Sequence, residues 1–372
     1  MKSFKTRFTA ICGLLVLGFN AALAQTYFDG GTGVWDNTTL NWNGGVNAWT
    51  PNGSATFGGA GSTVTIGDNL QIGSITFTAP AGAYTFDNTG GYQMDFNGSG
   101  ISTATAAVQL FSNTGNINFN AGASAGASTI HIDSFGNVNF TGAGATAGSS
   151  TLYNAGNLTF DSGATAGSAS IDNQGNLFFN GTSTGGTATV TNGGVLDISA
   201  HTPGNSTVTL DSLVNSSIYA GPQQINGSVI VGLNKLNLNN GLSLATVPLS
   251  GNNALGFQLA TTSTSGSISV LGGTFTGSDT GRTDITLTGP ATPGAPGVPF
   301  VLIDWTAATA SGVDLADFNL LTAPSSIGLA GYHMEIQGKQ LVLVPEPATL
   351  AMPLIAIFGM VLLRRKAARV AA

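Results

Sequence analysis

Residues 111–140, FSNTGNINFN AGASAGASTI HIDSFGNVNF, open a pattern that residues 141–199 continue. In it a Gly-Asn pair followed by an apolar residue recurs. The glycines lie 21, 20, 19 and 19 residues apart, at Gly115, Gly136, Gly156, Gly175 and, in a weaker Gly-Val-Leu form, Gly194. A constant period near twenty residues is typical of a solenoid, in which each repeat forms one coil that stacks on its neighbours.

Two columns of large apolar residues keep step with these glycines. The first column lies four residues after each glycine, at Phe119, Phe140, Phe160, Phe179 and Ile198. The second column lies four residues before each glycine, at Phe111, Ile132, Leu152, Ile171 and Val190. Apolar and polar residues alternate around both columns, which is typical of short strands with one buried face.

Glycine, alanine, serine and threonine fill the segments between these strands, where they favour tight turns. We therefore expect an all-β fold, a parallel β-helix of roughly 20-residue coils, with one aromatic and one aliphatic ladder inside. An amide ladder bonded along the axis is expected at Asn116, Asn137, Asn157 and Asn176. The alternative interpretation is that each Gly-Asn pair marks only a turn.

Charge is scarce and unevenly placed. Only 7% of the 372 residues are charged, against about a quarter in an average soluble domain. The span 25–344 has three basic and sixteen acidic residues, a net charge of −13. Nucleic acid and anionic lipid are therefore poor partners for this span, because both require a basic surface.

The first 24 residues have the pattern of an export signal. A basic start precedes the apolar run 11–19, and Ala22 and Ala24 satisfy the small-residue cleavage rule. We expect passage through the secretion translocon and a mature chain that begins at Gln25. That chain would have no cysteine, because the only one is Cys12.

Three of the four tryptophans, Trp35, Trp42 and Trp49, follow within residues 25–60. Tyr27-Phe28-Asp29-Gly30-Gly31, followed by Trp35 and Trp42, resembles the opening of exported proteins with autotransporter-associated, passenger-type β-strand repeats. One interpretation is an N-terminal cap that closes the first coil, because an open coil exposes unpaired backbone. The other is a set of platforms on which sugar rings stack.

The sequence divides the remaining chain into three parts. Residues 61–254 are expected to form the β-helix repeats, most regular over 111–199. Residues 255–344 are expected to hold the closing coils and a C-terminal cap, whose last strands turn at Gly338-Lys339. Residues 345–372 form a separate tail.

The tail begins with Pro345-Glu346-Pro347, continues with the uncharged run 348–363, and is closed by Arg364-Arg365-Lys366. This pattern resembles the PEP-CTERM sorting signal of exopolysaccharide-producing Gram-negative bacteria. Two features depart from it, namely Pro353 within the run and the six residues after Lys366. The alternative is an ordinary membrane anchor.

The resemblance implies that an exosortase, a membrane-embedded cysteine transpeptidase, recognises Pro345, Glu346 and Pro347. It also implies that 348–363 is a transmembrane helix followed by a basic stop, formed by Arg364, Arg365 and Lys366. Basic residues on the cytoplasmic side agree with the positive-inside rule.

Catalytic patterns are sparse. The segment 101–221 has no Lys or Arg, the base that β-helix polysaccharide lyases use. Asp133 and Asp172 are expected in the same register two coils apart, about 9.6 Å if stacked, near the separation in inverting glycosidases. Tyr153 lies between them. We expect no catalysis, no cofactor and no metal site.

The sequence thus predicts an exported structural or adhesive protein of the cell surface or exopolysaccharide matrix, held transiently in the inner membrane. One alternative is a carbohydrate-binding protein that uses Trp35, Trp42, Trp49 or Tyr153. A second alternative is a β-helix glycosidase.

Overall fold

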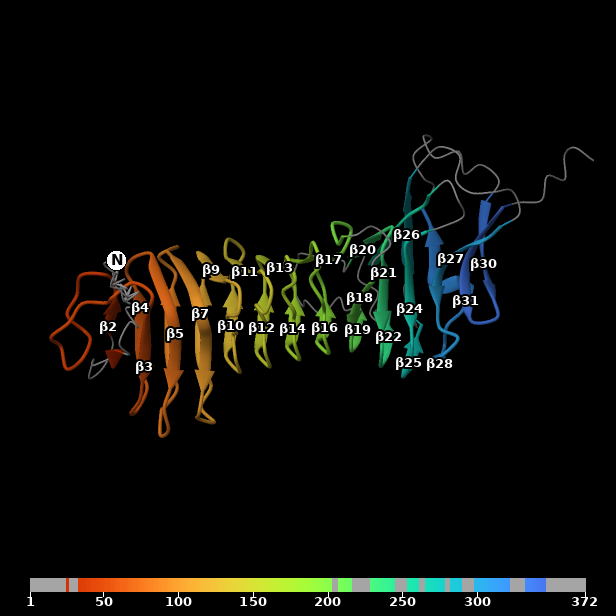
Figure 1. Ribbon diagram of the computed structural model, residues 1–372. Coiled ribbons are helices and arrows are strands. Elements are labelled where there is room, and N and C mark those ends of the chain that lie inside the picture. Colours follow the sequence, from red (N-terminus) through yellow and green to blue (C-terminus); the bar gives the residue numbers. More distant parts are fainter. Residues whose placement is uncertain are drawn as a thin grey trace, which may run out of the picture.

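The computed structural model describes residues 25–26, 33–202, 207–215, 228–244, 253–260, 265–277, 282–289, 298–321 and 332–345. These residues form an elongated stack of coils, which follow one another along a single axis from the N-terminal end to the C-terminal end (Figure 1). Strands of successive coils pair in parallel, so that strands far apart in the sequence become neighbours. The architecture is all-β and consistent with the predicted parallel β-helix.

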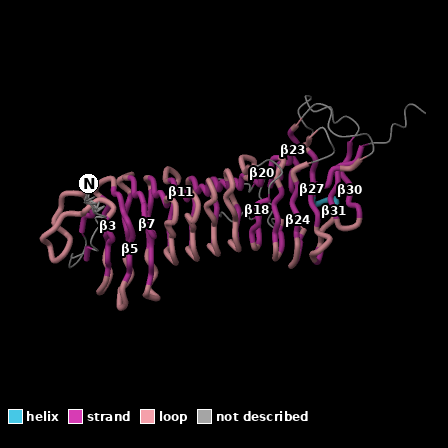
Figure 2. Tube along the Cα trace, in the orientation of Figure 1, coloured by secondary structure: helices cyan, strands magenta, loops and turns pink. Residues whose placement is uncertain are grey.

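Two long parallel sheets run along the stack, and a third sheet is confined to its C-terminal half (Figure 2). In order, the first sheet contains β1 (Gln25–Thr26), β3 (Gly53–Phe57), β5 (Leu70–Phe77), β7 (Gln93–Thr103), β9 (Asn116–Phe119), β11 (Asn137–Thr141), β13 (Asn157–Asp161), β15 (Asn176–Phe179), β17 (Val195–Asp197), β20 (Ser228–Gly232), β23 (Asn253–Gln258), β26 (Thr283–Thr288) and β29 (Phe318–Leu320). The second contains β2 (Gly33–Trp35), β4 (Thr63–Ile66), β6 (Thr85–Asn88), β8 (Leu110–Asn113), β10 (Thr129–Ile132), β12 (Thr151–Asn154), β14 (Ser170–Asn173), β16 (Thr189–Asn192), β19 (Ser212–Asn215), β22 (Gly241–Ser243), β25 (Thr274–Thr276) and β28 (Thr309–Ser311). The third contains β18 (Thr207–Leu210), β21 (Lys235–Leu238), β24 (Ser267–Val270), β27 (Phe300–Asp304), β31 (Gln340–Pro345) and β30 (Tyr332–Gln337).

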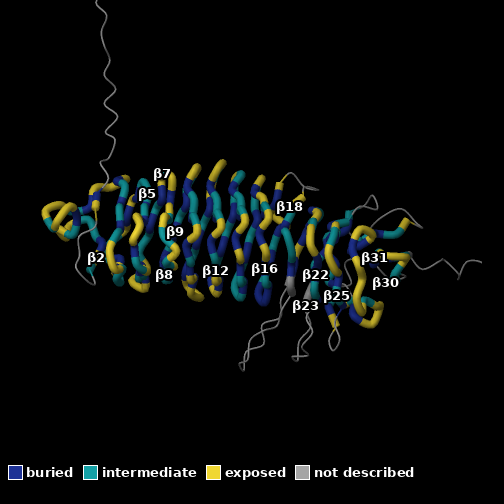
Figure 3. The backbone as a smooth tube through the Cα atoms, turned by 90° about the horizontal axis from the view of Figure 1, so that it is seen from below, coloured by how far each residue is buried: buried dark blue, intermediate teal, exposed yellow. Residues whose placement is uncertain are grey.

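The aromatic ladder and the amide ladder predicted from the sequence are both confirmed. Rings of Phe119, Phe140, Phe160 and Phe179 stack in nearly parallel pairs with centroids 4.7 to 5.1 Å apart, and Phe96 extends the ladder by one coil. The side chains of Asn116, Asn137, Asn157 and Asn176 bond in series, each Nδ2 donating to the Oδ1 of the preceding coil at 2.9 Å. Buried and more exposed residues alternate along the coils (Figure 3).

The predicted aliphatic ladder is wrong at one rung. Ile130, and not Ile132, pairs with Leu152 in β12 and with Phe111 in β8. The cause is the turn after β10, which occupies two more positions than the corresponding turns of the next coils. A count of four residues back from Gly136 therefore gives Ile132, which lies two residues after Ile130, the residue that occupies the ladder.

The corrected register reveals a second amide ladder inside the coil. Its side chains are buried, and each Nδ2 donates to the Oδ1 of the following coil at 2.6 to 2.8 Å, in the pairs Asn88–Asn113, Asn154–Asn173 and Asn173–Asn192. Ile132 occupies the equivalent position between Asn113 and Asn154. Among the described residues, the buried Oδ1 of Asn154 consequently has no hydrogen-bond partner.

The third side of the early coils is built from small residues. Isolated parallel bridges join Ser124, Thr146, Thr165 and Thr184 of successive coils, and the flanking alanines are buried. The glycine two residues after each bridge residue has a positive φ of 60° to 64°, at Gly126, Gly148, Gly167 and Gly186. A Cβ atom there would lie 2.4 to 2.6 Å from a carbonyl oxygen of the preceding coil, so both conformation and space require glycine.

The glycines of the Gly-Asn pairs have a different role. Their φ angles are not positive, but a Cβ atom would lie 2.1 to 2.3 Å from a backbone oxygen of the preceding coil, at Gly115, Gly136, Gly156, Gly175 and, in the Gly-Val-Leu form, Gly194. These glycines therefore allow successive coils to approach closely at this corner.

The coils lengthen in the C-terminal half, beyond the twenty residues predicted for the whole repeat. Thr207 in β18 pairs with Lys235 in β21, and Lys235 pairs with Ser267 in β24. Each of these coils contributes a third strand in place of the short small-residue side. The 3₁₀ helix η1 (Leu315–Asp317) lies in the last coil and is capped by Asp314.

Both ends of the stack are closed by large side chains. At the N-terminal end the three tryptophans lie together beside Phe57. At the C-terminal end β30 and β31 form the antiparallel hairpin predicted from the sequence, which turns at Gly338 and Lys339. The rings of Phe275 and Trp305 pack edge to face near the same end.

The aromatic ladder yields a stability prediction. Phe140 is fully buried between Phe119 and Phe160, so Phe140→Ala should lower the free energy of unfolding by about 3–5 kcal/mol. Asn139 points outward and makes one half-exposed bond to Asn118, so Asn139→Ala should cost about 1 kcal/mol or less. Urea unfolding would compare the two variants, and equal losses would contradict the assigned faces of β11.

The buried amide ladder yields a second prediction, based on two isoleucines of one strand. Asparagine at position 132 can donate to the orphaned Oδ1 of Asn154, whereas asparagine at position 130 meets only Phe111 and Leu152. Ile130→Asn should therefore lower the free energy of unfolding by about 3–5 kcal/mol. The loss for Ile132→Asn should be smaller than that for Ile130→Asn by about 2 kcal/mol. The midpoints of urea unfolding measure this difference, and the reverse order would refute the register of β10.

Candidate functional site

The three tryptophans predicted as a cap or as sugar platforms lie inside the first coils. Trp35 and Trp42 are fully buried and Trp49 is 3% exposed. Their ring centroids are 4.8 to 5.1 Å apart, in edge-to-face and tilted pairs, and the indole N–H of Trp49 donates to the carbonyl of Gln71. This burial provides the closure that a cap requires, and it leaves no ring face open for a sugar.

A polar turn directly follows the first of these tryptophans. Asp36 accepts hydrogen bonds from the backbone and side chains of Thr38 and Thr39, at 2.5 to 3.2 Å. Burial raises the pKa of the Asp36 carboxyl, but these bonds outweigh it, so the pKa lies below its ordinary value. A depressed folded-state pKa means that the turn is stabilised at neutral pH and loses that stabilisation as the pH falls through the folded pKa.

The predicted mature N-terminus lies at the start of the first sheet. Gln25 begins β1, is buried, and bridges the backbone of Ala48 and Thr50 through its amide. Ala22 and Ala24 lie outside the described residues, as do the rest of the predicted export signal and residues 27–32 of the predicted cap.

The predicted sorting motif begins at the last residue of the last strand. Pro345 ends β31 and stands opposite Tyr332 of β30. The rest of the predicted signal lies outside the described residues, including the span 348–363 and Glu346, Pro347, Arg364, Arg365 and Lys366. Within the described part of the chain, no helix is long and apolar enough to cross a membrane.

The hairpin that carries Pro345 is anchored to the coil beside it. Gln340 donates to the Asp304 carboxylate at 2.9 Å, and the Lys339 ammonium group donates to the carbonyl of Ala308 at 2.8 Å. The backbone N–H of Trp305 donates to the carbonyl of Lys339. The turn of the hairpin is thereby held against the C-terminal end of the coil stack, and β31 pairs with β27 as far as Leu343.

An exposed aromatic pair lies on the outer face of the second sheet. Tyr153 is 45% exposed, and its ring meets the ring of His131 of the preceding coil edge to face, with centroids 4.7 Å apart. Asp172 of the following coil is in the same row, and its carboxylate accepts a bond from Gln174 at 2.7 Å. The row presents an aromatic surface beside a carboxylate and an amide, a combination that can stack on and hydrogen-bond to a sugar ring.

The carboxylate pair considered for glycosidase chemistry is not in register. Tyr153 pairs with His131 on one side and with Asp172 on the other, whereas Asp133 lies in the turn beyond β10. The cause is again the longer turn, which also exposes Phe135. Counting back from the next glycine therefore misses His131 as the neighbour of Tyr153.

A signal that finds His131 does exist in the sequence. Gly126 and Gly148 lie in the turns before β10 and β12, and both have a positive φ. His131 and Tyr153 lie at the same distance after these two glycines. The forward count holds because the insertion comes after β10 and not before it.

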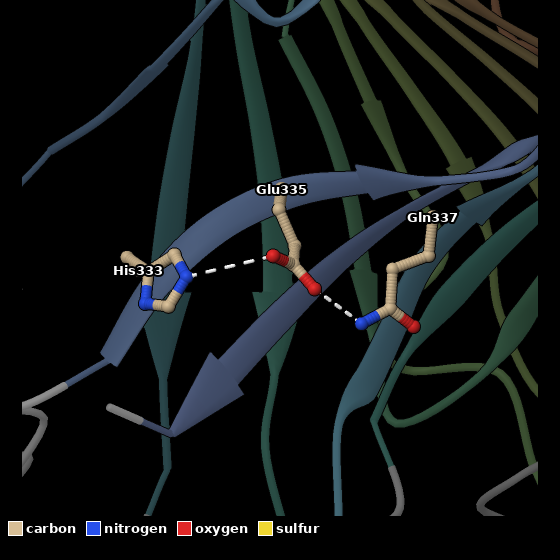
Figure 4. Close-up of polar contacts among 3 residues, drawn as sticks. All are labelled: His333, Glu335 and Gln337. Atoms are coloured by element: carbon tan, nitrogen blue, oxygen red, sulfur yellow. Dashed lines mark hydrogen bonds and ion pairs between the residues drawn. The ribbon is translucent and has the colours of Figure 1, made fainter. Parts of the chain in front are cut away.

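A second polar row lies on the outer face of β30 (Figure 4). The Nε2 of His333 is 3.6 Å from a carboxylate oxygen of Glu335, and the Gln337 amide donates to the other oxygen of the same carboxylate. His333 and Glu335 are both more than a third exposed. Within the described residues, no group of three or more His, Cys, Asp or Glu side chains is placed to hold a metal ion.

Comparisons with protein-family models, with curated proteins and with solved structures find no match for this chain.

Proposed function

We propose that this protein is an exported structural or adhesive component of the cell surface or exopolysaccharide matrix of a Gram-negative bacterium. It acts as a rod without catalysis of its own. The secretion translocon exports it, the helix 348–363 holds it transiently in the inner membrane, and an exosortase acts at Pro345, Glu346 and Pro347.

The position of Pro345 carries this proposal. The whole coil stack lies on the N-terminal side of the motif, and the motif begins where the last strand ends. A tail placed in this way can be recognised or removed without unfolding a coil in the middle of the stack. The motif and the stack therefore suit separate roles, namely delivery and surface structure.

The chemistry of the coil surface also supports the proposal. Outward positions on the first sheet carry amides and hydroxyls, such as Asn118, Asn139 and Thr159. The span 25–344 has a net charge of −13 and only three basic residues. Such a surface suits contact with water and uncharged glycans and disfavours ion pairing with acidic polymers.

The sorting proposal predicts the fate of one variant. Replacement of Pro345, Glu346 and Pro347 by alanine should leave the protein in the inner membrane with an uncut tail, because the transpeptidase loses its recognition element. Cell fractionation with mass spectrometry of both termini measures this. Gln337→Ala removes a polar side chain from the same hairpin, leaves the motif intact and serves as the control. Normal surface delivery of the alanine variant would contradict the sorting proposal and favour the alternative that the tail is an ordinary membrane anchor.

Carbohydrate binding is the second candidate function, and Tyr153 favours it. This ring is exposed on a sheet face, beside His131 and one coil from Asp172. In a body of net charge −13, the favoured ligand is a neutral polysaccharide, held by stacking and hydrogen bonds.

This second candidate predicts that Tyr153→Ala lowers retention on a neutral polysaccharide about fivefold or more, through loss of a stacking contact of about 1 kcal/mol. Affinity electrophoresis in gels with a neutral glucan measures the retention. Phe178→Ala, which removes an aromatic from the outer face of the first sheet, is the matched control. Binding should persist at about 0.5 M salt, because salt does not screen stacking. It should also persist with EDTA, because stacking needs no bridging cation. Equal retention of both variants and the wild type would exclude Tyr153 as the contact.

A further inference from the structure

Within the described residues, β30 has one paired edge and, from His333 to Gln337, one edge without a partner strand, the free edge. It is the last strand of the third sheet, and β31 is its neighbour. Among the described residues, no other strand pairs with it. A free edge presents a row of backbone donors and acceptors and is a ready template for another strand.

The hairpin turn determines which residues face that free edge. Gly338 and Lys339 form a two-residue turn, and Gln337 and Gln340 flank it. Gly338 has a positive φ of 62°. Residues that flank a two-residue turn exchange backbone hydrogen bonds, and the pattern then alternates along the strand. The backbone groups of His333, like those of Gln337, therefore face β31, and those of Met334 face the free edge.

The side chains of β30 divide in the same alternating way. Met334 and Ile336 pack against the hydrophobic core at the end of the stack. His333, Glu335 and Gln337 lie on the opposite, outer face (Figure 4). An imidazole and a carboxylate thus stand two positions apart on one exposed face, with Met334 midway between them.

We propose that β30 pairs antiparallel with β30 of a second copy of this chain, about a two-fold axis at Met334. In this register the backbone of Met334 exchanges both hydrogen bonds with its counterpart. His333 then stands opposite Glu335 of the second copy, and Glu335 opposite His333 of the second copy. Each cross-strand pair joins complementary charges when the imidazole is protonated, and a donor to an acceptor when it is neutral.

The neighbouring registers are disfavoured by the same side chains. An axis at Glu335 would place two carboxylates opposite each other, and an axis at His333 would place two imidazoles opposite each other. Like charges directly opposite destabilise a strand pair. An axis at Ile336 would place His333 opposite Lys339 of the second copy, and an axis at Tyr332 would lie at the very end of the strand. The sequence of β30 is therefore self-complementary in the register centred on Met334.

This pairing joins two stacks at their C-terminal ends through one continuous sheet. A single short strand edge buries little surface, so the free proteins should associate weakly and reversibly. Copies held on the same surface would associate more strongly, because their effective concentration is higher.

The test uses the exported protein with the termini that the cell leaves, studied by sedimentation velocity up to about 200 μM. The wild type should show reversible dimers. His333→Glu should weaken self-association about tenfold, because it sets two carboxylates opposite each other. Glu335→Lys should weaken it to a similar extent, because it replaces the acceptor opposite His333 of the second copy by a cation. The two single variants, mixed together, should associate with each other, since each introduced side chain then faces one of opposite charge.

A backbone variant separates strand pairing from other contacts. Met334→Pro removes an N–H that faces the free edge and no hydrogen bond to β31, so the fold should persist and the dimer should be lost. Unchanged circular dichroism and a cooperative thermal transition verify the fold of each variant. A wild type that stays monomeric, variants that dimerise equally well, or single variants that fail to associate when mixed would each overturn the proposal.

Discussion

Coil-on-coil stacking is the constraint on which this structure depends. In the regular coils, parallel pairing in constant register places each side chain directly above its equivalent in the preceding coil, so a residue type that repeats from coil to coil must be compatible with a copy of itself. Phenylalanine and asparagine satisfy this condition, as Phe140 on Phe119 and Asn137 on Asn116 show. Charged residues do not, because like charges a single coil apart repel each other. The low charge of the chain therefore follows from its architecture.

The buried amide ladder shows how strictly the condition applies inside the coil. An amide is costly to bury unless its donors and acceptors are bonded, and a neighbour of the same type supplies both. Asn173 has such neighbours in Asn154 and Asn192. Ile132 breaks the series and leaves the Oδ1 of Asn154 without a partner among the described residues. The ladder thus ties stability to register, and one mismatched rung affects the coil that follows.

The sequence predicts the stacking well and the local insertions poorly. Period and alternation correctly place Phe140, Phe160 and their equivalents, because no turn separates each of them from the glycine that precedes its strand. The position of Ile132 and the shared register of Asp133 and Asp172 are predicted wrongly, because the two extra residues after β10 change the register without changing the hydrophobic pattern. Burial of the tryptophans follows from closure of the first coil, but residue type alone does not distinguish it from a binding role. The later coils are longer because each has a third strand, and no repeat in the sequence predicts this strand.

The regular coils are also interchangeable modules. Residues of β11 pair with β13 in the same register as β13 pairs with β15, rung for rung from the asparagine to the phenylalanine. Loss or duplication of one coil would therefore join surfaces that already match, and neither terminal closure would need to change. The reach of the molecule can evolve in whole steps of about 4.8 Å, the spacing of adjacent strands. The length of the coil stack can therefore change without a change in the structures that close its two ends.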